Sequence, residues 1–307
     1  MEDNTGDGTG KRILGVGLVC LDIINVCDHY PSEDEKLRAL SQTRQRGGNA
    51  ANAVTVLAML GWKCEFFGTL SHGHESKFVL DELARYEIEH GNCVYHDNCG
   101  FPTSCAIISQ KSGSRTIIHS RNNLPELNVA DFQKLDLKYY GWIHFEGRNN
   151  VDEILKMSEL VRSYNTLVSQ DKRIIISVEI ERQRKEHLKL LSIGDVVFLS
   201  KDFAKFCGYK SAEDAVKDFH GKLSRSATVV CAWGTAGADG ISPSGTHVHS
   251  DSYPPEKVID TLGAGDTFIA GVINCLKRGG TLKDALIAGC KLAGKKCGML
   301  GFDGVCE

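Results

Sequence analysis

The stretch Asp260-Thr261-Leu262-Gly263-Ala264-Gly265-Asp266-Thr267 joins a glycine-rich turn to an apolar run of helical character, residues 268–276. At the start of a helix the first backbone N–H groups have no partner within the helix, and the helix dipole adds partial positive charge there. A phosphate can therefore bind to the N–H groups of Ala264, Gly265 and Asp266. A carboxylate in the same turn does not help phosphate binding, but Asp266 can accept the proton of a hydroxyl group that attacks the phosphate. The stretch predicts phosphoryl transfer to an alcohol.

The alternative is an ordinary loop in which Asp266 caps a helix, because short motifs often arise by chance. The turn is not a Walker A loop, since no Gly-Lys-Ser/Thr follows it, and it is not a protein-kinase Gly-rich loop. The complete octet resembles the signature of the PfkB family of sugar and nucleoside kinases, which have a ribokinase-like fold. That resemblance implies that Asp266 is the catalytic base and that Gly263, Ala264 and Gly265 form the catalytic turn around it.

Composition narrows the class of protein. The chain has 307 residues, 42% of them apolar, which is enough to bury a large core. A net charge of −3 and a pI near 6.4 give no general attraction to nucleic acid or to an acidic membrane. The 12 cysteines are scattered without a Cys-x-x-Cys pair, which indicates reduced thiols and a cytoplasmic protein. No apolar run approaches the ~20 residues that span a bilayer.

The chain organisation predicts one kinase domain with a lid. Residues 1–10 are acidic and glycine-rich, and we expect a flexible tail there. Within residues 11–307, strand-like and amphipathic runs alternate, which predicts an α/β fold with a mostly parallel central sheet flanked by helices. The stretches at about 20–46 and 100–122 read instead as short antiparallel strands, including a hairpin over Thr103 to Ser120. We expect them to form a small appended β-sheet lid whose exposed strands pair with a second copy in a homodimer.

Two stretches near the N-terminus point to a sugar site. The run from Ile13 to Val19 reads as a buried strand, and Asp22 follows at the carboxyl end where ligands bind in open α/β sheets. An ordinary turn aspartate is the alternative. Asn49 and Asn52 follow two glycines at i, i+3 spacing, so they share one face of a first helical turn. The stretch resembles the second signature of the family. The resemblance implies that the sugar binds to Asp22, Asp34, Gly48, Asn49, Asn52 and Asp266.

Other residues indicate a nucleotide-binding site. Gly234-Thr235-Ala236-Gly237 follows a buried strand and resembles the family's nucleotide loop, although a hairpin turn is the alternative reading. Arg115 can point from the lid toward the phosphates, or it can be a solvated strand residue. The resemblance implies ATP contacts at Arg115, Thr235, Ala236, Gly237, Gly263, Gly265 and Cys297. It further implies Mg²⁺ bound with ATP and a monovalent cation, K⁺, near Asp260. The sequence shows no ligand set for either ion.

Histidines give no metal signal. His144 lies mid-strand among apolar residues and is interpreted as a packed histidine. The His72-Gly73-His74 and His247-Val248-His249 pairs have no neighbouring Cys or Asp in a metal-ligand pattern and are interpreted as surface residues.

Further stretches narrow the expected substrate. They resemble members of the family that phosphorylate ketohexoses, and they are Trp142-Ile143-His144, Glu146-Gly147-Arg148-Asn149, Ser200-Lys201-Asp202, Cys231-Ala232-Trp233 and Ala293-Gly294-Lys295-Lys296-Cys297-Gly298. The resemblance implies ATP-dependent phosphorylation of D-fructose to fructose 1-phosphate. A kinase of ribose, a nucleoside or another sugar remains the alternative. A sugar or nucleotide sensor without turnover is a third possibility, against which the intact Asp266 argues.

Overall fold

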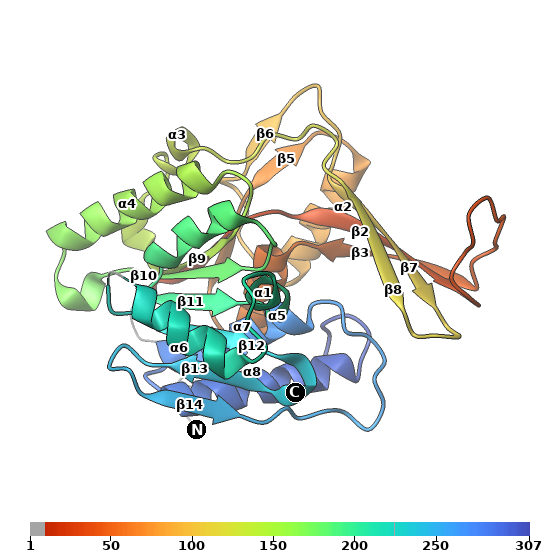
Figure 1. Ribbon diagram of the computed structural model, residues 1–307. Helices are drawn as coiled ribbons and strands as arrows, with labels where there is room; N and C mark the ends of the chain where they lie inside the picture. The colour runs from red at the N-terminus through yellow and green to blue at the C-terminus, as the bar shows by residue number, and fades with distance from the viewer. Residues whose placement is uncertain (1–9, 224) are drawn as a thin grey trace.

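A central sheet organises the computed structural model, which describes residues 10–223 and 225–307. The sheet has eight strands in the order β14-β13-β12-β11-β10-β9-β1-β4 (Figure 1). Their bounds are β1 Arg12–Val16, β4 Cys64–Phe67, β9 Tyr140–Glu146, β10 Ile175–Ile180, β11 Val196–Leu199, β12 Thr228–Ala232, β13 Ala238–Ile241 and β14 His247–Ser250. Apart from Gly10, the expected tail over residues 1–10 lies outside the described residues.

Most of this sheet is parallel, as the alternating pattern predicts. All neighbours from β12 to β4 run parallel, whereas β13 and β14 are antiparallel additions at one edge. The parallel strands are short and apolar because both faces are covered. In β9, Ile143 and Phe145 pack into the core on one face, while Trp142 packs into the core on the other.

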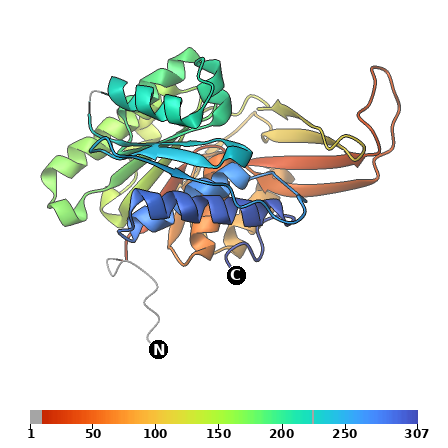
Figure 2. The same ribbon diagram turned by 60° about the horizontal axis from the view of Figure 1, so that its bottom comes forward.

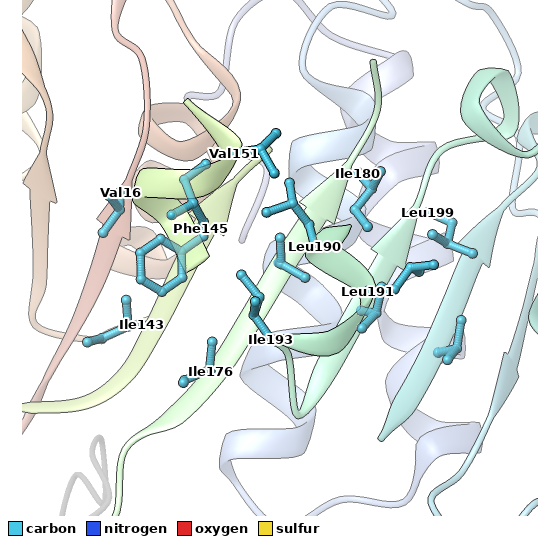
Figure 3. Packing of buried hydrophobic residues seen from close by; sticks show 14 of the residues in the cluster. Val16, Ile143, Phe145, Val151, Ile176, Ile180, Leu190, Leu191, Ile193 and Leu199 are labelled. Atoms are coloured by element: carbon cyan, nitrogen blue, oxygen red, sulfur yellow. The ribbon is translucent and has the colours of Figure 1, made fainter. Parts of the chain in front are cut away.

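Helices cover both faces of the sheet, and Figure 2 shows the resulting layers. One face carries α1 Asn49–Met59, α2 His74–Arg85, α7 Ala264–Lys277 and α8 Leu282–Cys297. The other carries α3 Val129–Phe132, α4 Val151–Leu167, α5 Lys201–Phe206 and α6 Ala212–Lys222. Short 3₁₀ turns are η1 Leu137–Tyr139, η2 Gln170–Lys172, η3 Lys185–Ser192 and η4 Gly234–Ala236. Figure 3 shows Leu190, Leu191 and Ile193 packed against apolar side chains of the central strands.

The appended sheet that the sequence predicts is present as a separate four-stranded sheet, β3-β2-β7-β8, that projects from one side of the molecule and is called the lid sheet below (Figure 1). Its strands are β2 Cys20–Cys27, β3 Ser41–Gly47, β7 Thr103–Ser109 and β8 Arg115–Ser120. β7 and β8 pair antiparallel, which confirms the predicted hairpin. A small parallel pair, β5 Thr69–Ser71 and β6 Val94–His96, lies nearby.

The strand expected over Ile13 to Val19 is shorter than predicted. β1 ends at Val16, and the N–H of Leu18 donates to the carboxylate of Glu146 (3.0 Å) in place of a neighbouring strand. The chain then enters the lid, so Asp22 lies inside β2 of the lid sheet rather than at the end of a central strand. Among the described residues, no helix is long and apolar enough to cross a membrane.

Candidate active site

A cavity of about 640 Å³ lies between the lid sheet and the carboxyl ends of the central strands. Of the residues predicted for the site, those that line it are Asp22, Gly48, Asn49, Asn52, Arg115, Gly263, Gly265 and Asp266. Those that do not line it are Asp34, Thr235, Ala236, Gly237, Ala264 and Cys297. The cavity therefore unites the two glycine-rich signatures and Arg115, but only part of the predicted nucleotide set.

The Gly263 to Asp266 turn has the geometry of an anion site. Gly263 is the N-cap of α7 with φ 75°, and a Cβ at this position would lie 2.6 Å from Cζ of Phe302, so only glycine fits. The N–H of Thr267 bonds to the carbonyl of Gly263 (2.9 Å). Within the described chain, the N–H groups of Gly265 and Asp266 make no hydrogen bond and remain free for an anion.

Asp266 is the buried carboxylate of this turn, with 6% of its surface exposed. The side-chain amide of Asn52 donates to its Oδ2 at 2.8 Å. Burial raises the pKa of Asp266 to about 8, and the negative charges of Glu181 and Glu146 act in the same direction, while the Asn52 hydrogen bond opposes them. A carboxyl group with such a pKa is suited to accept a proton near neutral pH.

Asn52 is itself held in place by Arg46, which is 4% exposed. The guanidinium donates to Oδ1 of Asn52 (3.0 Å) and to Oγ1 of Thr55 (2.7 Å). With its oxygen engaged by Arg46, the amide of Asn52 must present its NH₂ group to Asp266. The sequence alone did not predict this role of Arg46, because the contact depends on how β3 enters α1.

Asn49 has a different partner from Asn52. Its Nδ2 donates to both carboxylate oxygens of Glu179 (3.2 and 3.1 Å) and to Oε2 of Glu181 (2.8 Å). Burial, followed by the charges of Glu181, Asp266 and Glu146, raises the pKa of Glu179 well above its usual range. The two asparagines share the cavity as predicted, but each amide is engaged by a carboxylate. Neither Glu179 nor Glu181 was predicted from the sequence as a site residue.

Glu146 and Arg148 belong to a stretch that was quoted from the sequence only for its resemblance, and they line the cavity together. Arg148 donates to Oε1 of Glu146 (2.9 Å), and Oε2 accepts the backbone N–H groups of Leu18 (3.0 Å) and Ala50 (3.4 Å). Glu146 therefore holds the start of α1 beside the end of β1.

Arg115 connects the lid to the Gly263 to Asp266 turn. It begins β8, and its Nη1 donates to Oγ1 of Thr261 at 3.2 Å. Arg115, Ile117 and His119 alternate along β8 and all line the cavity, so this face of the lid sheet is the inner one. Arg115 thus lies on the cavity side of the lid, as one of the two sequence interpretations expected.

Several predicted residues lie elsewhere. Asp34 is exposed in the loop between β2 and β3, far along the lid. The Gly234 to Gly237 stretch is a hairpin between β12 and β13, which was the alternative reading. Gly237 has φ 82°, and a Cβ there would lie 2.0 Å from the carbonyl of Ser250, so strand packing requires this glycine. Only Gly234 of the stretch reaches the cavity.

Cys297 acts through its backbone in this structure. Its carbonyl accepts the N–H groups of Ile259 (2.7 Å) and Asp260 (3.2 Å), which fixes the chain just before the catalytic turn. Asp260 is bound more firmly by Lys296, which is completely buried. The Nζ of Lys296 lies 2.7 Å from Oδ2 and 3.2 Å from the carbonyl oxygen of Asp260.

The histidines differ partly from expectation. His144 is fully buried and bonds to Oγ of Ser177 (2.9 Å), so its interpretation as a packed histidine is confirmed. His247 and His249 do have an acidic partner, since both contact Oδ1 of Asp239 on the adjacent strand (2.9 and 3.0 Å). Strand pairing supplies this neighbour, which sequence spacing could not show. Among the described residues, no group of three or more His, Cys, Asp or Glu could hold a metal ion.

The fold and the free N–H groups beside a buried carboxylate define a class of protein: ribokinase-like kinases, which transfer phosphate from ATP to a hydroxyl group. Residues 11–302 match the family model described as pfkB family carbohydrate kinase, and the chain belongs to this family. It is therefore an ATP-dependent sugar kinase, and kinases of this family generally act with Mg²⁺.

Individual relatives agree with the family. The chain is 46% identical over 295 residues to a ketohexokinase of Mus musculus, covering 96% of this chain and 99% of the relative. It is 25% identical to an ATP-dependent 6-phosphofructokinase of Thermoanaerobacterium thermosaccharolyticum, covering 94% and 88%. Among solved structures, a putative ribokinase from Agrobacterium tumefaciens has a TM-score of 0.78 at 18% identity, covering 95% of this chain and 92% of that one. Adenosine kinase from Schistosoma mansoni has a TM-score of 0.79 at 16% identity, covering 95% and 96%, and these two likenesses show the fold alone.

Proposed function

We propose that the chain phosphorylates D-fructose to fructose 1-phosphate with ATP, with Asp266 as the general base. The observation that carries the proposal is the buried Asp266 carboxylate, held by Asn52 in the turn whose free N–H groups can receive phosphate. The similarity to a protein named ketohexokinase supports fructose among the sugars.

The sugar would bind under the lid, on the side of Asp22. Asp22, Gly48, Asn49 and Asn52 line this part of the cavity and offer one carboxylate and two amides to sugar hydroxyl groups. Asp34 does not reach the cavity within one chain, so direct sugar contact would require a second copy to bring its own lid loop to the site.

The phosphates of ATP would lie on the turn from Gly263 to Asp266, against the free N–H groups of Gly265 and Asp266, with Arg115 opposite them on the lid; the N–H of Ala264 is already bonded to the carbonyl oxygen of Thr261. The planar guanidinium of Arg115 can contact two phosphate oxygens. Thr235, Ala236, Gly237 and Cys297 do not line the cavity, but the first three directly follow Gly234, which does, and Cys297 holds the segment before the catalytic turn. On this basis we assign them to the surroundings of the rest of the nucleotide.

The two ions differ in how well the residues fit them. Mg²⁺ would arrive with the phosphates of ATP, because the described residues hold no ready set of three ligands, and Glu179 and Glu181, which line the cavity, would be the carboxylates available to hold it. When bound it neutralises charge on the transferring phosphate. K⁺ beside Asp260 fits poorly, since Lys296 already pairs with that carboxylate.

In the reaction the sugar hydroxyl oxygen forms a bond to the γ-phosphorus, and the bond between that phosphorus and the β–γ bridging oxygen breaks. Asp266 accepts the hydroxyl proton, and ADP leaves with the bridging oxygen. The N–H groups of Gly265 and Asp266 and the charge of Arg115 stabilise the transferring group. Lid closure excludes water, which would otherwise compete as a nucleophile.

We further propose a cytoplasmic homodimer that forms through the lid sheets. Ile118 of β8 is 62% exposed and alternates with the inner residues of that strand, so it lies on the outer face. An exposed apolar sheet face is suited to pairing with a second copy. The substitution Ile118→Glu should yield monomers in analytical ultracentrifugation, and an unchanged dimer would contradict this interface.

Measuring ADP release with fructose, ribose, adenosine and glucose tests the activity. We expect fructose to have the highest kcat/KM, and ³¹P NMR of the product should place the phosphate on C1. A preference for ribose or adenosine would identify a different kinase of the same family. Tight ATP binding without ADP release from any of the four would favour a sensor.

A further inference from the structure

A row of polar side chains crosses the inner face of the lid sheet. In the strand register, Asp22 of β2 pairs with Gln45 of β3 on one side and with Ser104 of β7 on the other. Ser104 in turn pairs with His119 of β8. All four residues line the cavity. Directly opposed residues in a sheet lie close enough for their side chains to interact, so the row can act as one unit.

The contacts along the row run from Asp22 to His119. Oγ of Ser104 lies 3.1 Å from Nδ1 of His119. The thiol of Cys20 donates to Oδ1 of Asp22 (3.3 Å) and lies 3.8 Å from Oγ of Ser104. Burial raises the pKa of Asp22, whereas the polar groups of Ser104 and Cys20 beside its carboxylate favour the charged form. Ser104 is buried at 7% exposure, so solvent does not readily replace these partners.

The single hydroxyl proton of Ser104 fixes the direction of these hydrogen bonds. The thiol proton of Cys20 is donated to Asp22, so the Ser104 hydroxyl is the donor in its contact with the Cys20 sulfur. The Ser104 oxygen is then left to accept from His119, which requires the proton of the imidazole to be on Nδ1. In the opposite tautomer Nδ1 would accept the Ser104 proton, and the thiol that holds Asp22 would lose its own donor.

The charges around His119 favour a neutral ring. Burial lowers its pKa, and Arg148 after β9, Arg182 after β10 and Arg121 after β8 lower it further, while Asp22 on β2 acts in the opposite direction. In the neutral ring with a proton on Nδ1, Nε2 is an acceptor that makes no hydrogen bond to any described residue.

We propose that His119 is a positioning residue for the sugar site: through Ser104 and Cys20 it orients the carboxylate of Asp22 and thereby sets the affinity for the sugar. The proposal rests on the proposed role of Asp22 in sugar binding. His119 and Arg115 lie four residues apart on β8, about 13 Å in an extended strand, so His119 serves the sugar end of the lid and Arg115 the phosphate end.

The chain of contacts by which His119 acts on Asp22 is called the relay below. Steady-state kinetics of four variants test it. His119→Leu and Ser104→Ala should each raise the KM for fructose by about 5- to 10-fold, within the range for the net contribution of one hydrogen bond, with the KM for ATP and kcat nearly unchanged. The double variant should be no worse than Ser104→Ala alone, because both changes break the same relay. His119→Asn places an amide N–H where Nδ1–H stood, and it should restore the KM to within about threefold of the original.

Two further measurements keep the test decisive. Ser120→Ala removes a hydroxyl that bonds to Asn122 on the outer side of the same strand, and it should leave the kinetics unchanged. ¹⁵N NMR of the histidine rings in the intact protein should show His119 protonated on Nδ1, and in Ser104→Ala this signature should be lost. This readout does not depend on catalysis.

The outcomes separate the relay from the proposed function. If Asp22→Ala raises the KM for fructose but His119→Leu does not, the relay is wrong and the sugar site stands. Additive effects in the double variant, or a His119 ring protonated on Nε2, would also overturn the relay. If the unmodified protein does not phosphorylate fructose, the proposed function fails, and the tautomer measurement still decides the relay.

Discussion

Asn52 and Asp266, which are 214 positions apart in the sequence, meet through a 2.8 Å hydrogen bond at the floor of the cavity. This bond joins the first turn of α1 to the first turn of α7, so the two glycine-rich signatures form one site. Because Arg46 holds the oxygen of the Asn52 amide, the orientation of the amide toward Asp266 is fixed before any substrate binds.

The first prediction concerns the substitution Asp266→Asn. Asparagine keeps the shape but cannot accept the proton, so kcat should fall by about 10²- to 10⁴-fold while ATP and fructose still bind. Rapid-quench kinetics and isothermal titration calorimetry measure the two effects. A loss of kcat below tenfold would remove Asp266 from its role as base.

The same carboxylate should make both activity and stability depend on pH. Asp266 works as a base only when deprotonated, so kcat/KM should rise with pH up to about 8.

Stability should change in the opposite direction. Between the ordinary aspartate pKa and about 8, the folded state keeps a proton that the unfolded state has lost, so stability falls as pH rises through this window. In thermal unfolding, Asp266→Asn should lack this pH-dependent loss of stability. If the Tm of both proteins fell equally with pH, the raised pKa of Asp266 would be contradicted.

Substitutions on the sugar side should affect one substrate only. Asp22→Ala should raise the KM for fructose about tenfold or more and change the KM for ATP by less than about threefold, since the lost hydrogen bonds go to the sugar. Asn49→Ala should behave similarly, with an added loss of stability because Glu179 and Glu181 lose a donor between them. Equal changes in both KM values would mean that these residues are misplaced.

The extent of sequence-based prediction differs between parts of the site. The Gly263 to Asp266 turn was predictable because its geometry is local: a glycine at positive φ followed directly by a helix. Arg46, Glu181 and the Ser104–His119 contact were not, since each depends on pairing between strands or on the end of a strand far away in sequence. The Gly234 to Gly237 loop could not be assigned from its local motif, because a hairpin turn and a nucleotide-binding loop can have the same spacing of glycines.

Lys296 should stabilise the catalytic turn through Asp260. Its ammonium group is fully buried, 2.7 Å from a carboxylate whose side chain is 11% exposed. Lys296→Met leaves that carboxylate unpaired, and breaking a buried pair in this way typically costs about 3–5 kcal/mol of stability. Calorimetry should show a lower Tm, and adding Asp260→Asn should recover part of it.

The pairing of Lys296 with Asp260 also predicts that replacing K⁺ by Na⁺ has little effect on kcat. A strict K⁺ requirement would show that the ion competes with Lys296 for this carboxylate.

Arg115 should act mainly in the transition state. Its guanidinium lies at the edge of the lid and already contacts Thr261 beside the catalytic turn, so a small closing movement can bring it to the transferring phosphate. Arg115→Lys keeps the charge but loses the planar fork that can contact two phosphate oxygens, and kcat should fall. Arg115→Ala should reduce kcat further, by about 10²-fold or more, since it removes a charge that stabilises the transition state. The Tm should change little in either variant, because the side chain is exposed.

Steady-state kinetics with saturating fructose and ATP measure the loss of kcat. The matched control is Arg44→Ala, a change to an exposed arginine of β3 that does not line the cavity. An Arg115→Ala protein with a normal kcat would show that the lid does not contribute charge to the reaction.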